Sequence, residues 1–94
     1  MNVFLTRQAE QNYDSIREYM RKEWGQSVAE SFEEKVDYLF KLLTVFPQMG
    51  QVEKNDIRGF QISRQTRIFY RIKDERIIIL SLFDVRQDPR KTHH

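Results

Sequence analysis

The 94-residue sequence predicts an α+β fold. A short strand and a helical hairpin precede a three-stranded antiparallel meander, which completes one sheet packed against the helices. Two periodicities indicate this order. Apolar residues recur every three or four positions from residue 9 to residue 46, as on one face of a helix, and then alternate or run together from residue 57 to residue 83, as in strands. The length predicts a single domain, which we expect to span residues 1–92, with His93 and His94 as the remnant of a purification tag.

The first strand and the first helix are predicted from residues 3–25. The apolar run from Val3 to Leu5 indicates a short strand, and Thr6 is placed to cap the helix that follows. One apolar stripe then continues with helical spacing through Ala9, Tyr13, Ile16, Met20 and Trp24. Gly25 is expected to end this helix, because glycine tolerates a positive φ at little cost.

The second helix is expected to begin at a capping box formed by Ser27 and Glu30. Its apolar stripe comprises Ala29, Phe32, Val36, Leu39, Leu43 and Phe46, and it is widened by Phe40 and Leu42. Pro47 should stop the helix, because the residue before a proline avoids helical angles. The two helices then form an antiparallel hairpin.

Strands are predicted for the rest of the fold. Residues 48–56 read as a polar loop with at most a short extended piece, and residues 57–63 as a strand interrupted by Gly59. Between residues 66 and 72 the side chains alternate, so that Ile68, Tyr70 and Ile72 face one way and Arg67, Phe69 and Arg71 face the other. Residues 73–76 form a hairpin turn. The apolar run at residues 77–83 predicts a central strand covered on much of both faces.

The composition of the chain excludes several classes of functional site. The chain has no cysteine, and its two histidines are the last two residues, so we expect neither a metal site nor a nucleophile–histidine pair nor a cofactor. It has no long apolar run, and the default location is the cytoplasm, away from the membrane. Residues 1–53 carry six Lys or Arg and nine Asp or Glu, a net charge of −3, whereas residues 54–94 carry ten and five, a net charge of +5. An anionic partner is therefore expected on the basic half.

The candidate binding residues are arginines. Guanidinium groups bind phosphates or carboxylates, and an aromatic ring between two of them could stack on a base. The candidate set is Arg58, Arg64, Arg67, Phe69, Arg71, Arg86 and Arg90. The alternative is that these arginines are surface residues whose stems cover the sheet, with Asp84 and Asp88 as ion-pair partners on either side of Arg86. The residues alone leave both interpretations open.

The chain resembles the ParE-like members of the RelE/ParE superfamily of bacterial toxins. The resemblance is carried, in order, by Ala9, Ile16 and Tyr19, Trp24-Gly25, Phe46-Pro47 with Gly50, Ile57-Arg58, Arg67 to Ile72, Ile77 to Leu80, and Arg86 to Pro89. It implies the fold predicted above and a toxin neutralised by an acidic antitoxin encoded with it. The sequence does not decide whether the protein forms a homodimer.

The resemblance implies two activities that the chain could have. RelE-like relatives cleave mRNA on the ribosome, and Arg67 and Arg86 match two of their phosphate-binding arginines, with Arg58 near a third basic position. However, Phe60 occupies a lysine position of that site, and residues 90–92 lack the catalytic tyrosine. ParE-like relatives instead inhibit DNA gyrase, although Asp84 stands where many of them have a histidine. We therefore expect a gyrase inhibitor rather than an enzyme. The alternatives are an mRNA endoribonuclease and a degenerate, non-toxic domain that only binds its antitoxin.

Overall fold

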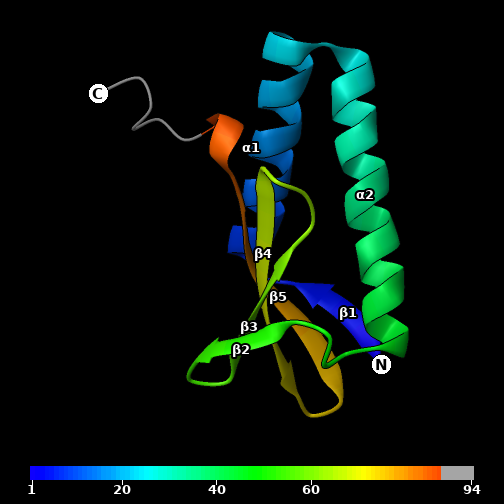
Figure 1. Cartoon of the computed structure of the whole chain (residues 1–94), viewed down its shortest axis with the longest axis vertical. Helices are drawn as coiled ribbons and strands as arrows, with labels where there is room; N and C mark the ends of the chain where they lie inside the picture. Colours follow the sequence, from blue (N-terminus) through cyan, green and yellow to red (C-terminus); the bar gives the residue numbers. More distant parts are fainter. Residues whose placement is uncertain (88–94) are drawn as a thin grey trace.

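The computed structural model describes residues 1–87 and has the predicted α+β architecture (Figure 1). Two antiparallel helices lie side by side, and the remaining elements form one sheet. In chain order the elements are β1 (Asn2–Leu5), α1 (Arg7–Trp24), α2 (Gln26–Val45), β2 (Gln51–Lys54), β3 (Ile57–Gln61), β4 (Thr66–Lys73), β5 (Arg76–Asp84) and the short 3-10 helix η1 (Val85–Gln87). Within residues 1–87, neither helix is apolar enough over a sufficient length to cross a membrane.

The sheet has five strands in the order β1-β5-β4-β3-β2, one more than the sequence predicted. Strand β1 pairs in parallel with β5, and the other neighbours are antiparallel. The additional strand is β2, which lies within the predicted loop at residues 48–56. Its four side chains are all exposed, so no apolar alternation marks it in the sequence. It is held by a two-residue turn in which Asn55 and Asp56 have φ values of 51° and 67°, the geometry that suits a tight hairpin.

Strand β5 is an interior strand, but its two faces differ. Ile77, Ile79 and Leu82 are buried against the helices, whereas Ile78 and Leu80 on the other face are only half-buried. The predicted cover on much of both faces is therefore complete on the helix side and only partial on the other side. Both helices contribute their buried stripes to one side of the sheet, so the opposite side has no covering layer among the described residues. The middle position in the sheet belongs to β4.

Helix α1 begins as predicted. The Thr6 hydroxyl accepts a hydrogen bond from the Ala9 backbone N–H at 3.1 Å and donates one to the Leu80 carbonyl at 3.0 Å, which ties the helix start to β5. The apolar stripe is confirmed for Ala9, Ile16 and Met20, which are buried. Trp24 is an exception and is 55% exposed, because it occupies the last helical turn beyond the end of the sheet (Figure 1).

Helix α2 begins earlier than predicted, and the expected Ser27–Glu30 capping box is wrong. Gly25 ends α1 and caps α2 at once, with a φ of 101° that favours glycine, and its carbonyl accepts the N–H of Ala29 at 3.2 Å. Ser27 therefore already lies inside the first turn of the helix, and no side-chain hydrogen bond caps this end. At the other end, Phe46 is 58% exposed instead of buried, because the chain has left helical geometry there, with a φ of −124°.

Tyr70 fixes the segment that links α2 to β2. Its ring is buried, and its hydroxyl donates to the Pro47 carbonyl and accepts from the Gly50 N–H, both at 2.8 Å. A Cβ at Gly50 would lie 2.7 Å from the Tyr70 ring, so this close approach requires glycine. Arg58 adds bonds from its Nη1 to the carbonyls of Gln48 and Gly50, at 3.1 and 2.7 Å. The segment is therefore held by buried and half-buried side chains of the sheet.

Candidate functional site

The candidate arginines do not converge on one site. In an antiparallel pair, residues directly opposite each other project to the same face of the sheet. Arg58 lies opposite Tyr70 and so projects toward the helix side, whereas Arg67 lies opposite Gln61 and Phe83 and projects toward the open side. Arg64 is exposed in the turn between β3 and β4. Arg90 and Asp88 lie outside the described residues.

The open face of the sheet carries Arg67, Phe69 and Arg71, as the alternation predicted. The Arg67 guanidinium lies 5.3 Å from the centroid of the Phe69 ring, in cation–π contact. Arg67 also pairs with the Glu53 carboxylate and donates to Gln61 Oε1 at 3.3 Å. Glu53 belongs to β2 and Gln61 to β3. The ion-pair partner of Arg67 therefore comes from β2, the strand that the sequence did not predict.

Aromatic and aliphatic side chains extend this open face across β5 and β1. Phe83, opposite Arg67, is 39% exposed, and Ile78 lies opposite Arg71. At the edge, Phe4 is exposed, and the Arg76 guanidinium sits 5.8 Å from its ring centroid. The result is an uncovered sheet surface of mixed apolar and cationic character, a composition common at protein interfaces. The sequence did not indicate this exposed apolar part, because the prediction was that much of both faces of β5 would be covered.

Arg86 is held by Asp84, as the ion-pair interpretation proposed. Its Nε and Nη2 donate to the two Asp84 carboxylate oxygens at 3.0 and 2.9 Å, and its backbone N–H donates to Asp84 Oδ1 at 2.9 Å. The Thr66 hydroxyl also donates to this carboxylate. Asp84 is 2% exposed, and burial by itself would raise its pKa. The hydrogen bonds from Arg86 and Thr66 outweigh that effect and bring the pKa of Asp84 below its ordinary value.

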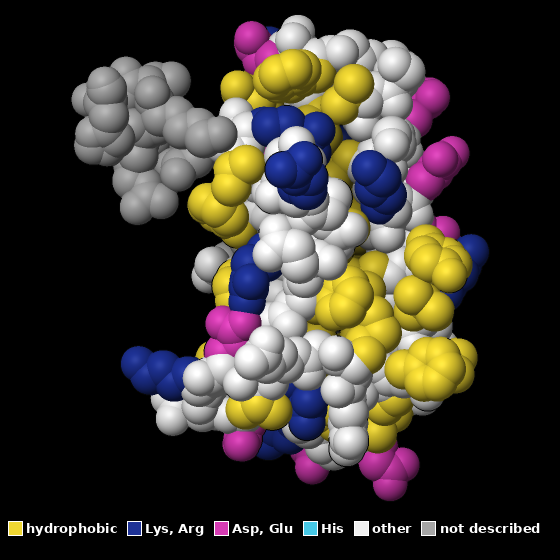
Figure 2. Space-filling view, in the orientation of Figure 1, with side chains coloured by type: hydrophobic (Ala, Val, Ile, Leu, Met, Phe, Trp, Pro, Cys, Tyr) yellow, Lys and Arg dark blue, Asp and Glu magenta, His cyan; other side chains and the backbone are white. Residues whose placement is uncertain are grey.

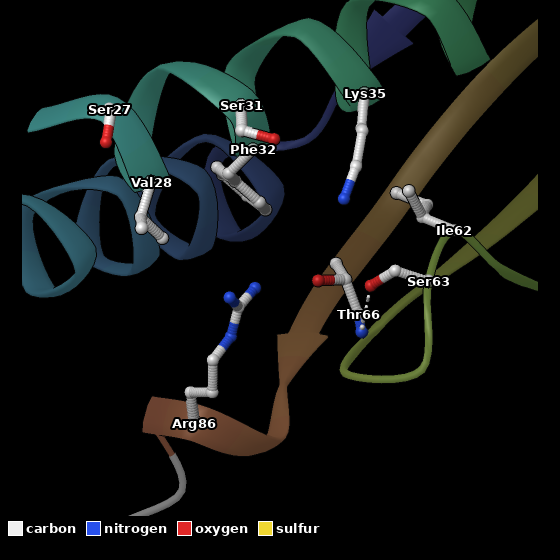
Figure 3. Close-up of a pocket in the computed structure, with 9 residues that line it drawn as sticks. All are labelled: Ser27, Val28, Ser31, Phe32, Lys35, Ile62, Ser63, Thr66 and Arg86. Carbon is white, nitrogen blue, oxygen red and sulfur yellow. Dashed lines mark hydrogen bonds between the residues drawn. The ribbon is translucent and has the colours of Figure 1, made fainter. Parts of the chain in front are cut away.

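A pocket of about 240 Å³ lies beside Arg86, between α2 and the turn that joins β3 to β4. Two cationic side chains enter it from opposite walls, Lys35 from α2 and Arg86 from η1 (Figure 3). The rest of the wall consists of four hydroxyl-bearing side chains and three apolar ones, namely Ser27, Ser31, Ser63, Thr66, Val28, Phe32 and Ile62. Ser27, Ser31 and Lys35 were not among the binding residues predicted from the sequence. Their spacing of four residues on one helix is a signal that could have found them.

An apolar groove lies at the C-terminal end of α2. It has a volume of about 620 Å³ and is lined mainly by Leu42, Val45, Phe46, Pro47 and Met49. A neighbouring hollow continues it along the helix past Tyr38 to Phe60 on β3. Figure 2 shows apolar side chains gathered along this α2 side of the molecule. Phe46, the residue of the predicted stripe that is exposed at this end, belongs to this groove together with the exposed Val45.

The cationic and hydroxyl side chains at these surfaces supply groups that can bind a ligand. Arginines, a lysine and hydroxyls can hold anions. A proton acceptor for catalysis would have to be a histidine, tyrosine or carboxylate within reach of a bound substrate. Burial raises the pKa of the Tyr70 hydroxyl, despite the bond from Gly50 and the charge of Arg58, so it remains protonated near neutral pH. That hydroxyl already bridges Pro47 and Gly50 on the helix side of the sheet, away from Arg67.

Comparison with known proteins identifies the family. Residues 3–89 match the family described as the ParE toxin of the type II toxin–antitoxin system parDE. None of the curated proteins is significantly similar in sequence. Among solved structures, the fold is similar to that of a chain in the chromosomal ParDE toxin–antitoxin system of P. aeruginosa. That chain is 21% identical, the match covers 90% of this chain and 96% of the other, and the TM-score is 0.76.

Two further structures show the same fold at lower identity. One is a copper-bound mutant toxin from Helicobacter pylori, 14% identical over 94% of this chain and 98% of the other, with a TM-score of 0.66. The other is a chain of the intact E. coli RelBE toxin–antitoxin complex, 15% identical over 88% and 94%, with a TM-score of 0.56. The two helices and five-stranded sheet are thus the fold of ParE and RelE toxins. Since the family match spans residues 3–89, the chain belongs to the ParE toxins of type II toxin–antitoxin systems.

Proposed function

We propose that this ParE-family toxin acts by binding and inhibiting DNA gyrase, in the cytoplasm, and that a cognate antitoxin neutralises it. The observation that carries the proposal is the separation of Arg58, Arg67 and Arg86. A ribonuclease needs its cations gathered around one phosphate, with a proton acceptor beside them. Here Arg58 and Arg67 project to opposite faces of the sheet. Arg86 is engaged by Asp84 and lines a pocket against α2.

Each of the three arginines also has an acceptor within the protein. Arg58 bonds the carbonyls of Gln48 and Gly50, Arg67 pairs with Glu53, and Arg86 pairs with Asp84. These bonds hold the structure and keep the three guanidinium groups apart, so the groups would have to leave their partners to converge on one phosphate. Inhibition by binding to a protein target does not require these arginines to converge on one phosphate. The open sheet face around Phe69, Arg71 and Phe83 offers apolar area and charge for a protein target.

Purified toxin is expected to inhibit supercoiling by DNA gyrase or to trap its cleaved DNA complex, and to leave mRNA intact on purified ribosomes. Arg71→Ala should weaken the gyrase effect, because this side chain lies on the open face and bonds only the Asn55 carbonyl among the described residues, at 3.3 Å. Arg21→Ala is the matched control, because Arg21 is an exposed arginine on α1 paired with Glu18.

The two assays separate the alternatives. Codon-specific mRNA cleavage that disappears in Arg67→Ala would replace the gyrase proposal with the RelE-like activity. Inactivity in both assays, with a folded protein, would favour a degenerate domain that only binds its antitoxin. A gyrase effect equal in Arg71→Ala and Arg21→Ala would mean that the open sheet face is not the surface that contacts the target.

The antitoxin is proposed to be acidic and to approach the basic half of the chain. Residues 54–94 carry a net charge of +5, against −3 for residues 1–53. Opposite charges speed diffusional encounter, and salt screens them. Raising NaCl from about 50 to about 300 mM is therefore expected to lower the association rate by roughly tenfold, with a smaller effect on dissociation. Stopped-flow or surface-binding kinetics measure both rates. An association rate independent of ionic strength would exclude the basic half as the steering surface.

A further inference from the structure

We propose that the pocket between α2 and the β3–β4 turn is a carboxylate receptor that takes an aspartate or glutamate side chain of the antitoxin. The identity of the partner rests on the proposed function, whereas the preference of the pocket for a carboxylate does not. Lys35 is the residue at the centre of this assignment. It was not among the arginines that the sequence singled out, and it enters the pocket from α2 opposite Arg86 (Figure 3).

The two cations retain donors for a ligand. Among residues 1–87, no carboxylate lies within ion-pair distance of Lys35. Arg86 uses its Nε and Nη2 for Asp84, which leaves Nη1 without an acceptor in the described part of the chain. Asp84 itself is buried behind Arg86, with no exposed side-chain surface, so it cannot occupy the pocket as well. Instead it holds the guanidinium in one orientation, which lowers the entropy lost when a second anion binds.

Hydroxyl groups line the pocket between the two cations (Figure 3). Ser27 and Ser31 precede Lys35 on α2 at intervals of four residues, so the three side chains share one face of the helix. Ser63 stands on the opposite wall, where its Oγ accepts the backbone N–H groups of Gln65 and Thr66, each at 3.2 Å. The Thr66 hydroxyl donates to Asp84 and the Ser63 hydroxyl to Gln65 Oε1 at 3.5 Å, so the donors left for a ligand are Lys35 Nζ, Arg86 Nη1 and the hydroxyls of Ser27 and Ser31. These groups match the lone-pair sites of a carboxylate.

The surroundings favour a single carboxylate over a nucleic-acid backbone. Glu30 and Glu34 are exposed on α2 three residues after Ser27 and Ser31, so they stand next to the pocket on the same helix. A chain of phosphates running along this helix would meet those two carboxylates. A single aspartate or glutamate side chain that enters the pocket does not have to run along the helix past these two carboxylates. The apolar walls formed by Val28, Phe32 and Ile62 suit the methylene groups of an aspartate or glutamate.

A titration followed by ¹H–¹⁵N NMR tests the chemistry of the pocket. N-acetyl-glutamate α-amide should shift the backbone signals of Ser31, Lys35 and Ser63 and saturate with a dissociation constant on the order of millimolar. The isosteric N-acetyl-glutamine α-amide should bind about tenfold more weakly, because it lacks the charge. Lys35→Met should weaken binding by about tenfold as well. Lys41→Met is the control, since Lys41 is exposed on the same helix and pairs with Asp37.

Three results of the titration would overturn the assignment. They are equal shifts with the glutamine compound, an affinity unchanged in Lys35→Met, and tighter binding of a thymidine tetranucleotide than of the glutamate compound. The last result would assign the pocket to a nucleic-acid phosphate. Lys35→Met is chosen over an Arg86 variant because Arg86 also supports the fold. These measurements do not involve gyrase, so a failed gyrase assay and a failed titration are separate outcomes.

Zero-length crosslinking tests whether the occupant comes from the antitoxin. A carbodiimide joins a lysine amine to a carboxylate only when the two are in contact, so the complex of the toxin with its antitoxin should give an amide between Lys35 Nζ and an aspartate or glutamate of the partner. Mass spectrometry of the digested complex identifies the linked residues. Lys35→Met should abolish this product and leave other links unchanged. Links from Lys41 or Lys54 without one from Lys35 would show that the antitoxin does not fill the pocket.

Discussion

Replacing Leu43 with alanine is expected to lower the free energy of unfolding by about 2–5 kcal/mol. Leu43 is fully buried and belongs to the core that joins α2 to the sheet. Truncation removes apolar contacts and leaves a cavity that the surrounding helices and strands can close only in part. Urea denaturation followed by circular dichroism measures the difference.

Val45→Ala is the matched control for the Leu43 variant. Val45 is also an aliphatic residue near the end of α2, but it is 66% exposed, so its truncation should change stability by less than about 0.5 kcal/mol. A melting temperature of Leu43→Ala equal to that of Val45→Ala would mean that α2 presents a different face to the sheet.

Replacing Arg86 with alanine is expected to lower the free energy of unfolding by about 3 kcal/mol, the lower end of the range for breaking a buried pair. The variant leaves the Asp84 carboxylate buried, with only the Thr66 hydroxyl and the backbone N–H of residue 86 to satisfy it. The lower end applies because the Arg86 side chain is 22% exposed, so water can partly replace it. Denaturant unfolding near pH 7 gives the value.

The free energy of unfolding that is lost in Arg86→Ala should become smaller as the pH is lowered. In the native protein the pKa of Asp84 lies below its ordinary value, so the unfolded state takes up the proton first and the pair stabilises the fold fully only above about pH 4. This stabilisation falls as the pH drops through the native pKa. In the variant, burial without Arg86 raises the pKa of Asp84. Acid then protonates this carboxylate more readily, which removes the free-energy cost of keeping an unpaired negative charge buried. The difference between the two proteins should therefore shrink from pH 7 toward about pH 3.

Asp84→Asn combined with Arg86→Ala provides the control. This double variant removes the buried charge along with its partner, and it should recover part of the stability lost in Arg86→Ala. Toxicity measured beside stability separates structural support from target contact. Toxicity lost in proportion to stability indicates that Arg86 acts by holding Asp84. Toxicity lost in a variant that is still folded at the assay temperature would place Arg86 on the surface that contacts the target.

Local patterns in the sequence were sufficient for much of the fold. The helical spacing of Ile16 and Met20, and of Val36, Leu39 and Leu43, correctly identified the faces that become buried, because a helix that packs on a sheet must turn its apolar stripe inward. Alternation along β4 correctly separated Ile68 and Tyr70 from Arg67, Phe69 and Arg71. These features depend on the geometry of a single element, which neighbouring residues in the chain determine.

The helical spacing did not show where the buried part of each apolar stripe ends. Trp24 and Phe46 continue the helical period, yet both are exposed. Trp24 lies beyond the end of the sheet, and at Phe46 the chain has left helical geometry. Strand β2 has no apolar residue pattern at all, since it sits at the edge of the sheet with every side chain exposed. Its existence follows from pairing with β3.

The arrangement of the candidate sites was decided by tertiary structure alone. Alternation says which residues of one strand share a face, but it does not relate one strand to the next. The register that places Arg58 opposite Tyr70 sends Arg58 to the helix side, and so it separates Arg58 from Arg67. The placement of Lys35 and Arg86 on opposite walls of one pocket likewise requires α2 to pack next to η1 and the β3–β4 turn (Figure 3). Residues this far apart in sequence become neighbours only through strand pairing and helix packing, which the spacing within each element does not encode.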